Sequence, residues 1–288
     1  MLLCDKWKEY ELIDASMGMK YERWGDVFLL RPDPQVIWNN GDLCEKYKNN
    51  IDAIYHRSNK GGGYWENIKS IPSSWCIRYD NLTFNIKQMG FKHTGLFPEQ
   101  LVNWDFMINK IKKCHRNIKV LNLFAYTGGA TVACLSAGAS VTHVDSSRGM
   151  VDWCKENVNS SGLSTSNVRY LVDDVVKFVK REIRRGNKYD GIIMDPPSYG
   201  RGSNGEVWDI EKDLYNLIEL CTELLSEKFL FMIINSYSTG LSKEVISNCV
   251  KLTTVGKFDG KIDSFELGLP IKENNLFLPC GVTIRYER

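Results

Sequence analysis

The stretch VLNLFAYTGG, residues 120–129, joins an apolar run to a glycine pair that opens a helical pattern. An apolar run that ends at a turn is typical of a buried strand, and glycines at a helix start let backbone N–H groups approach a ligand closely. The turn is not the G-x-G-x-x-G of NAD enzymes, because Phe124 and Tyr126 stand where a dinucleotide loop needs glycine for its pyrophosphate. It fits an adenosine ligand without pyrophosphate, and it fits a purely structural strand–helix connection equally well.

Outward from this turn, apolar runs alternate with amphipathic stretches from about residue 95 to the end of the chain. Continuous apolar strands separated by amphipathic helices are typical of a parallel sheet that is buried on both faces. The pattern therefore predicts an α/β fold with a doubly wound, Rossmann-like sheet. Strands are predicted at residues 119–124, 140–145, 168–172, 189–195, 229–235, 261–269 and 282–286, and helices at residues 98–113, 129–137, 149–160, 174–185, 209–225 and 242–251.

Before residue 95 the sequence is rich in aromatic residues, turn signals and short alternating runs. YERWGDVFLL at residues 21–30 and WCIRYDNLTFNI at residues 75–86 are each typical of a strand. Turns are predicted at residues 31–34, 39–41 and 60–63. We therefore expect two domains: a small β-rich module at residues 1–94 and an α/β domain at residues 95–288.

Composition excludes several classes of protein. The chain has 288 residues, of which 43% are hydrophobic and 25% charged, so it is too apolar for a disordered chain. No apolar run approaches the ~20 residues that span a bilayer, and the amino-terminal sequence lacks the apolar centre of a secretory signal. The nine cysteines form no C-x-x-C pair, so we expect no metal site, no disulfide framework and a cytoplasmic location. A net charge of +2 leaves nucleic-acid binding open.

Acidic residues follow the second and third predicted strands, and ligands of a doubly wound sheet bind at the carboxyl ends of its strands. Asp145, followed by Ser146, stands about 20 residues beyond the glycine turn, where a carboxylate can accept both hydroxyls of a ribose. Asp145 as a simple helix N-cap is the alternative. At the third strand end we expect Asp174 to cap the next helix and Asp173 to face an adenine amine, although the reverse assignment fits almost as well.

The fourth predicted strand ends in DPPSYGRG, residues 195–202. Each proline removes a backbone donor and fixes φ, so Pro196 and Pro197 make a stiff wall that points Asp195 into the cleft. Such a wall can hold a flat base edge-on, with the carboxylate accepting from N–H groups and Tyr199 stacking on the ring. The alternative is a rigid strand exit that binds nothing.

Five motifs occur in order over about two thirds of the chain: GLFPEQ (95–100), NLFAYTGGAT (122–131), HVDSSRGMVDWCKENV (143–158), DD (173–174) and DPPSYGRG (195–202). The domain that carries them resembles the class I S-adenosylmethionine-dependent methyltransferases. More narrowly, it resembles the bacterial 23S ribosomal RNA large-subunit methyltransferases that act on cytosine C5 or guanine N7.

The resemblance implies a site for S-adenosyl-L-methionine. Asp145 would bind its ribose, Asp173 would lie beside the adenine, and Gln100 would close the pocket from the preceding segment. Asp195 and Pro196 would lie beside the transferred methyl group. The methionine side of the cofactor would be lined by Phe124, Ala125, Tyr126, Thr127 and Gly128.

The sequence departs from the family pattern at three places. Asn122 replaces an acid that often stands on the first strand, so it can hydrogen-bond but brings no charge toward the ammonium group of the cofactor. Tyr199 comes one place too late for the Asp-Pro-Pro-Tyr pattern of exocyclic-amine methyltransferases. Tyr237, in NSYS at residues 235–238, stands where cytosine-C5 relatives have the cysteine whose thiolate adds to the ring. Cys280 is the other cysteine considered for that role, and we expect it to be a buried structural thiol.

Some conspicuous residues have simpler structural interpretations. His143, within the second predicted strand, is expected to be a satisfied core histidine rather than a base. The tryptophans of the small module are expected in its core, with a stacking platform for bases as the alternative. Basic clusters at residues 110–116 and 180–185 can bind phosphates or simply complement helix dipoles.

We therefore expect an S-adenosylmethionine-dependent methyltransferase that acts on a base of RNA, with ribosomal RNA as the first candidate. A ring nitrogen is favoured over cytosine C5, because it needs little more than Asp195 to orient the base and share a proton. Methylation of a protein or small molecule is one alternative. Cofactor binding with lost catalysis is the other.

Overall fold

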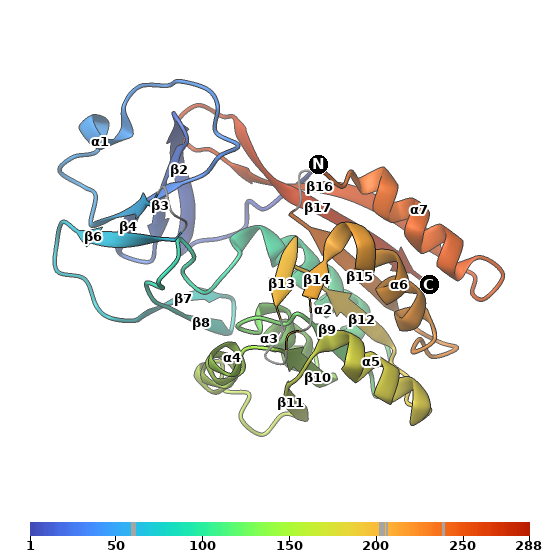
Figure 1. Cartoon of the computed structure of the whole chain (residues 1–288). Coiled ribbons are helices and arrows are strands. Elements are labelled where there is room, and N and C mark those ends of the chain that lie inside the picture. The colour runs from blue at the N-terminus through green and yellow to red at the C-terminus, as the bar shows by residue number, and fades with distance from the viewer. Residues whose placement is uncertain (59–61, 202–204, 206, 238–239) are drawn as a thin grey trace. The chain divides into compact units, whose positions relative to one another are not determined.

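The computed structural model describes residues 1–58, 62–201, 205, 207–237 and 240–288 (Figure 1). The chain divides into two compact units. The larger unit comprises Met1–Leu2, Gln100–Leu267 and Gly281–Arg288, and the smaller unit comprises Leu3–Glu99 and Gly268–Cys280. This division differs from the predicted one, because residues 95–99 and 268–280 fall in the smaller unit. The second of these segments is a late return of the chain that local sequence patterns do not indicate.

The predicted strands and helices of the α/β part all occur. The strands are β1 (Leu2–Leu3), β9 (Lys119–Leu123), β10 (Ser140–Asp145), β11 (Val168–Val172), β12 (Gly191–Met194), β15 (Phe231–Ser236), β16 (Lys261–Pro270) and β17 (Phe277–Glu287). The helices are η1 (Pro98–Gln100), α2 (Leu101–Lys112), α3 (Gly129–Ser136), α4 (Arg148–Ser160), α5 (Val175–Arg184), α6 (Ile210–Thr222) and α7 (Lys243–Thr254). Neither β1 nor the short hairpin of β13 (Tyr199–Arg201) and β14 (Val207–Asp209) was predicted.

An eight-stranded sheet has the order β1-β16-β17-β15-β12-β9-β10-β11. β9, β10, β11, β12 and β15 are parallel, whereas β17 pairs with β15 in the antiparallel direction. The chain steps outward from β9 through β10 to β11, and then resumes at β12 and β15 on the other side of β9. The predicted doubly wound sheet is therefore confirmed, with the order reversing between β9 and β12. Its antiparallel strand β17 makes the sheet mixed rather than wholly parallel.

Side chains of the parallel strands alternate between two covered faces. On one face, Leu121, Leu123 and Val144 belong to a buried core that residues of α5, α6 and α7 complete. On the other face, Asn122 contacts a residue of α3 and His143 contacts residues of α3 and α4. The carboxyl ends of β9, β10 and β12 are therefore held at one edge of a rigid layer.

The smaller unit is rich in strands, as predicted. A five-stranded sheet has the order β2-β3-β4-β5-β6, and β7 pairs with β8 in a separate hairpin. One short helix, α1 (Leu43–Lys46), follows the sheet strand β4. The strands are β2 (Tyr10–Ser16), β3 (Met19–Trp24), β4 (Val27–Pro32), β5 (Ala53–Arg57), β6 (Gly63–Asn67), β7 (Trp75–Tyr79) and β8 (Leu82–Ile86).

The prediction of single strands at residues 21–30 and 75–86 is wrong, because each stretch contains a hairpin. The first turns at Gly25, which has φ 65°, and the second turns at Asp80, which has φ 49°. Glycine adopts a positive φ freely and aspartate tolerates it better than most residues, so two-residue turns fit inside runs that otherwise look continuous. Of the turn predicted at residues 60–63, residues 60 and 61 lie outside the described part of the chain.

The tryptophans of the smaller unit serve its packing. Trp24 is fully buried. Trp38, Trp65 and Trp75 are half-buried, and each donates its indole N–H to a main-chain carbonyl of the same unit at 2.7–2.9 Å. These contacts support the core interpretation over the stacking platform.

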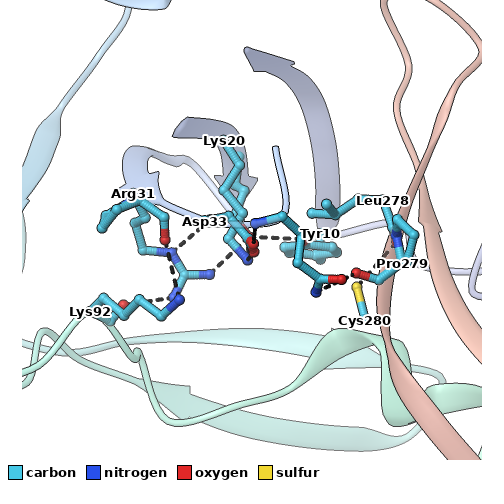
Figure 2. A network of polar contacts seen from close by, with 11 residues as sticks. Tyr10, Lys20, Arg31, Asp33, Lys92, Leu278, Pro279 and Cys280 are labelled. Atoms are coloured by element: carbon cyan, nitrogen blue, oxygen red, sulfur yellow. Dashed lines mark hydrogen bonds and ion pairs between the residues drawn. The ribbon is translucent and has the colours of Figure 1, made fainter. Parts of the chain in front are cut away.

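A charged network is buried in the smaller unit (Figure 2). Arg31 pairs with Glu22 at two points, with Nε 2.6 Å from Oε2 and Nη2 2.8 Å from Oε1. The Tyr10 hydroxyl donates to Glu22 Oε1 at 2.8 Å, and Lys20 lies 3.7 Å from the same oxygen and 3.3 Å from Asp33. Glu22 is 0% exposed and Arg31 is 4% exposed. Loss of either partner would therefore leave an uncompensated charge inside the unit.

The network also makes the stability of this unit depend on pH. Burial raises the pKa of the Glu22 carboxyl, but the charges of Arg31 and Lys20 and the hydrogen bonds that Glu22 accepts outweigh it and lower the pKa from 4.5 to about 2. Because the folded-state pKa lies below the unfolded value, the ionised carboxylate contributes stability above pH 4.5. That contribution is lost as the pH falls toward 2.

We expect Glu22→Gln to lower the free energy of unfolding by about 3–5 kcal/mol at neutral pH, because Arg31 would keep a buried charge without a carboxylate. The matched control is Glu11→Gln on β2, whose carboxylate is 29% exposed and lies 3.8 Å from Arg23 and 2.9 Å from the exposed Lys272. Glu11→Gln should lower the free energy of unfolding by less than about 1 kcal/mol. Urea unfolding of the full chain at about pH 7 and about pH 3 measures both variants, and the effect of Glu22→Gln should shrink at the lower pH. Equal losses of unfolding free energy in the two variants would contradict the stabilising role of the buried Glu22–Arg31 pair.

Candidate active site

The turn after β9 has an unusual backbone. Phe124 and Tyr126 have φ values of 53° and 51°, and Gly128 has φ 82°. A left-handed conformation costs a residue other than glycine about 1–3 kcal/mol, and such strain persists only where the surrounding structure imposes it. The Ala125 N–H donates to the Val144 carbonyl on β10 at 3.1 Å, which ties the turn to the neighbouring strand. The turn is therefore a fixed feature of the sheet edge.

The glycine pair of this turn is required by the helices beneath it. A Cβ atom on Gly128 would lie 2.2 Å from Sγ of Cys154 on α4, and one on Gly129 would lie 2.6 Å from Cζ2 of Trp104 on α2. Asn157, also on α4, donates to the Thr127 carbonyl at 2.8 Å. Close packing thus explains both glycines, while their contact with a ligand stays a prediction.

Asp145, at the end of β10, connects this turn to the next helix. Its Oδ2 accepts the Tyr126 N–H at 2.8 Å, and its Oδ1 accepts the Ser147 N–H at 2.8 Å. Burial raises the pKa of Asp145 above 3.8, although the two hydrogen bonds act to lower it. Asp145 as a simple N-cap is wrong, because Ser147 is the N-cap of α4. Ser146 lies between them and is exposed.

The two aspartates after β11 have different surroundings. Asp174 is the N-cap of α5 and accepts the Lys177 N–H at 2.8 Å, which confirms the capping assignment. Asp173 pairs with the Arg181 guanidinium, and its N–H donates to the Asp145 carbonyl at 3.0 Å. The main chain therefore links the ends of β10 and β11. A contact between Asp173 and an adenine stays a prediction.

The segment after β12 is braced by a residue that the sequence analysis missed. Trp208, on β14, donates its indole N–H to the Pro197 carbonyl at 2.7 Å, and its ring centroid lies 5.2 Å from that of Phe124. Pro196 is buried, Asp195 is half-buried and Tyr199 is 54% exposed. The wall and the left-handed turn are thus joined through one indole ring. The last glycine of DPPSYGRG, residue 202, lies outside the described residues.

Asn122 lies in a buried polar chain below the turn. Its amide donates to Thr131 Oγ1 at 3.0 Å, and Thr131 Oγ1 lies 2.9 Å from His143 Nδ1. Cys154 Sγ also lies 3.4 Å from His143 Nδ1, and the direction of both contacts depends on which ring nitrogen carries the proton. Nε2 has no hydrogen-bond partner among the described residues, so His143 is a core residue that is only partly satisfied. Burial lowers the pKa of His143 to about 3, which keeps its ring neutral.

Gln100 and Tyr237 meet at the same edge of the sheet. Gln100 Nε2 donates to the Tyr237 hydroxyl oxygen at 2.8 Å, and Asn103 Nδ2 donates to Gln100 Oε1 at 2.9 Å. Asn103 is buried on α2, so it holds the Gln100 amide in place. Sequence patterns gave no signal for Asn103 beyond a polar residue on the apolar face of a predicted helix.

The hydrogen-bond acceptors at the strand ends fit S-adenosylmethionine. Its ribose, adenine and ammonium groups all present N–H or O–H donors, and the carboxylates of Asp145, Asp173 and Asp195 follow the ends of three strands of one sheet. The left-handed turn carries bulky side chains where a pyrophosphate would need glycine. Among the described residues, no group of three or more His, Cys, Asp or Glu side chains is placed to hold a metal ion. No helix in that part of the chain is long and apolar enough to cross a membrane.

We expect Gly128→Ala to destabilise the chain more than Gly138→Ala, although both glycines have a positive φ. A Cβ atom on Gly138 would meet nothing within 4 Å, so that variant carries only the backbone cost, about 1 kcal/mol. Gly128→Ala adds the collision with Cys154, which should lower the free energy of unfolding by about 1–3 kcal/mol more. Urea unfolding compares the two variants. Adding Cys154→Ala should restore part of the extra loss, and equal losses for Gly128→Ala and Gly138→Ala would contradict the packing argument.

Relatives named as ribosomal RNA methyltransferases share part of this sequence. The chain is 30% identical over 189 residues to ribosomal RNA large subunit methyltransferase K/L of Syntrophotalea carbinolica, covering 65% of this chain and 26% of that protein. It is 28% identical over 200 residues to ribosomal RNA large subunit methyltransferase K of Neisseria meningitidis, covering 69% of this chain and 55% of that protein. The chain thus spans about a quarter of the first relative and about half of the second.

Solved structures share the whole fold. A crystal structure of an S-adenosylmethionine-dependent methyltransferase from Agrobacterium tumefaciens is 34% identical, has a TM-score of 0.94 and covers 99% of this chain and 92% of that chain. A methyltransferase complexed with SAH is 21% identical, with a TM-score of 0.75 over 98% of this chain and 76% of that chain, which shows the shared fold. The family of S-adenosylmethionine-dependent methyltransferases matches residues 54–251, a range that contains the left-handed turn, Asp145 and Asp195. With the doubly wound sheet and the strand-end carboxylates, these matches show that the chain belongs to the S-adenosylmethionine-dependent methyltransferase family.

Proposed function

We propose that this methyltransferase acts on a base of RNA, with ribosomal RNA as the first candidate, in the cytoplasm. The observation that carries the proposal is the stiff wall after β12, in which Asp195 precedes the buried Pro196 and Trp208 holds the Pro197 carbonyl. A rigid strand end with a half-buried carboxylate suits a flat ring that presents N–H groups. Relatives named as ribosomal RNA large subunit methyltransferases support the same class of substrate.

The residues around the strand ends would each contact a different part of the bound cofactor. Bound S-adenosylmethionine supplies a methyl group that its sulfonium already activates. Asp145 would accept the ribose hydroxyls, with Ser146 beside it, and Asp173 would accept from the adenine amine. The turn at residues 124–128 would line the methionine side, and Gln100 would close the pocket. Asp174 is occupied as the cap of α5, so we assign it no contact with the adenine.

The chain would then need only to align the acceptor atom with the methyl group. Asp195 would hold the base by accepting from its N–H groups and would take or share a proton as a ring nitrogen is methylated. Pro196 and Pro197 keep that carboxylate from swinging away, because their φ angles are fixed. Tyr199, 54% exposed on β13, can cover the face of the base.

A ring nitrogen is a better acceptor for this chain than cytosine C5. Attack at C5 requires a thiolate that adds to the ring, and the residue after β15 is Tyr237. Cys280 is half-buried rather than fully buried as expected. Burial of its thiol, reinforced by the charge of Glu99, raises the pKa of Cys280 well above its usual value. Its Sγ donates to the Leu278 carbonyl at 3.3 Å (Figure 2). A thiol held in its protonated form is a poor nucleophile, which argues against Cys280 in that role.

We expect the full chain to label a single nucleoside at a ring nitrogen when it is incubated with methyl-labelled S-adenosylmethionine and total RNA from cells that lack its gene. Asp195→Ala should reduce the labelling about 100-fold or more, because the base would lose its proton acceptor. Asp152→Ala is the matched control, since that carboxylate is 50% exposed on α4 and forms an ion pair with Lys155 on the same helix. Digestion to nucleosides and mass spectrometry identify the product.

Three results would count against parts of this proposal. Label in protein or small molecules, with none in RNA, would contradict the substrate class. Label on a base carbon would contradict the preference for a ring nitrogen. Full activity of Asp195→Ala would contradict the role given to the wall after β12.

A further inference from the structure

Helix α5 of the larger unit (Figure 1) carries a row of cations on its solvent-facing side. The side packed into the core consists of Val175, Phe178, Val179 and Glu182. The opposite side carries four cations at helical spacing, which we call the basic stripe: Lys177, Lys180, Arg181 and Arg184. The rise of an α-helix makes the basic stripe about 11 Å long. It is therefore a row of charge along the helix rather than a cluster at one helix end.

Acidic side chains do not neutralise the basic stripe along its length. Glu182 is the single acid of α5, and it is 0% exposed on the core side of the helix. Arg181 pairs with Asp173, which precedes the helix. In the part of the chain that the structure describes, Lys180 and Arg184 form no ion pair, and both are exposed. These two cations are therefore available to an anionic partner.

The stability of the helix itself does not explain the basic stripe. Lys177 lies in the first turn, where the positive end of the helix dipole disfavours a cation. Lys177 and Arg181 stand four residues apart, and like charges at this spacing destabilise a helix. Lys180 and Arg184 form a second pair of the same kind. The dipole favours only the two arginines, which lie in the last turn. A partner that carries negative charge would offset these unfavourable terms.

Helices α4 and α7 of the same unit mix the two signs of charge. Lys155 pairs with Asp152 on α4, and Lys243 pairs with Glu244 on α7. The net charge of the whole chain is only +2, so the four cations of the basic stripe are a local concentration of positive charge. A local concentration of this kind is typical of a surface that binds nucleic acid.

The basic stripe adjoins the edge of the sheet that carries the proposed site. α5 begins directly after Asp173 and Asp174, at the carboxyl end of β11. β11 lies three strands from β12 in the sheet order, which at about 4.8 Å per strand is a lateral distance of about 14 Å. Stacked nucleotides rise about 3.4 Å each, so about four of them span this distance. An RNA whose target base lies at the wall after β12 can therefore bring its neighbouring phosphates to the basic stripe.

We propose that the basic stripe binds the phosphodiester backbone of the RNA, beside the nucleotide that is methylated. Ammonium and guanidinium groups are common partners of phosphate oxygens, and the Arg184 guanidinium can donate two hydrogen bonds to one phosphate. Contacts to phosphates are independent of base sequence, so the stripe would supply affinity and orientation while the wall after β12 selects the base. This inference rests on the proposed function, because it concerns how the RNA substrate is held.

Lys180→Gln/Arg184→Gln tests the proposal by removing the two exposed cations that form no ion pair. We expect the affinity for poly(uridylate), a single-stranded RNA of uniform sequence, to fall about 10- to 30-fold at about 0.1 M salt. The slope of the logarithm of the binding constant against the logarithm of the salt concentration should become shallower by about 1.4, since each phosphate contact of a single strand contributes about 0.7. Fluorescence anisotropy of labelled RNA measures both quantities. The affinity for S-adenosylhomocysteine and the melting temperature should stay unchanged.

Lys251→Gln/Lys257→Gln is the matched control. Both lysines are exposed, one in the last turn of α7 and one just after the helix, so the control lowers the net charge by the same amount. It should leave the salt slope unchanged. Equal changes of the salt slope in the two double variants would overturn the inference, because net charge alone would then explain the binding.

The binding measurement needs no methyl transfer, so the inference and the proposed function can fail separately. If the unaltered chain methylates RNA and Lys180→Gln/Arg184→Gln keeps the same salt slope, the inference is overturned and the proposed function stands. If the unaltered chain binds RNA through the basic stripe and methylates none, the proposed function is overturned and the stripe remains an RNA contact. If the unaltered chain does not bind poly(uridylate), the inference is overturned whatever the labelling experiment shows.

Discussion

The two hydrogen bonds that the Asp145 carboxylate accepts are the constraint on which the site depends. One oxygen holds the Tyr126 N–H in the left-handed turn after β9, and the other holds the Ser147 N–H at the start of α4. A carboxylate has about four lone-pair sites, so two remain for the hydroxyls of a ribose. A single side chain thereby fixes the shape of the turn, and we propose that its remaining acceptor sites bind the ribose.

The rest of the edge is fixed by contacts within the protein. Gly128 and Cys154 set how closely α4 approaches the turn, and Trp208 joins the turn to the wall after β12. The chain from Arg285 through Asn103 to Gln100 orients the residue at the end of β15. Buried polar chains of this kind are costly when a member is missing, because each remaining partner is left unsatisfied. The geometry of the site therefore depends on contacts along the whole edge of the sheet rather than on individual loops.

The sequence predicted the α/β sheet and its strand ends well, because continuous apolar runs and the residues that follow them are local signals. It did not predict the hairpins at Gly25 and Asp80, although the turn-forming pairs Gly25-Asp26 and Asp80-Asn81 were a local signal for them. It also missed the hairpin that carries Trp208 and the pairing of Glu22 with Arg31. These features depend on which strands become neighbours, and neither composition nor periodicity contains that information.

The most direct test of this account is the affinity of Asp145→Asn for S-adenosylhomocysteine, measured by isothermal titration calorimetry beside the unaltered chain. We expect the unaltered chain to bind one equivalent and the variant to bind about 10-fold or more weakly, because a neutral amide has one acceptor oxygen where the carboxylate has two. Equal affinities for the two proteins would contradict the claim that Asp145 organises the turn and holds the ribose.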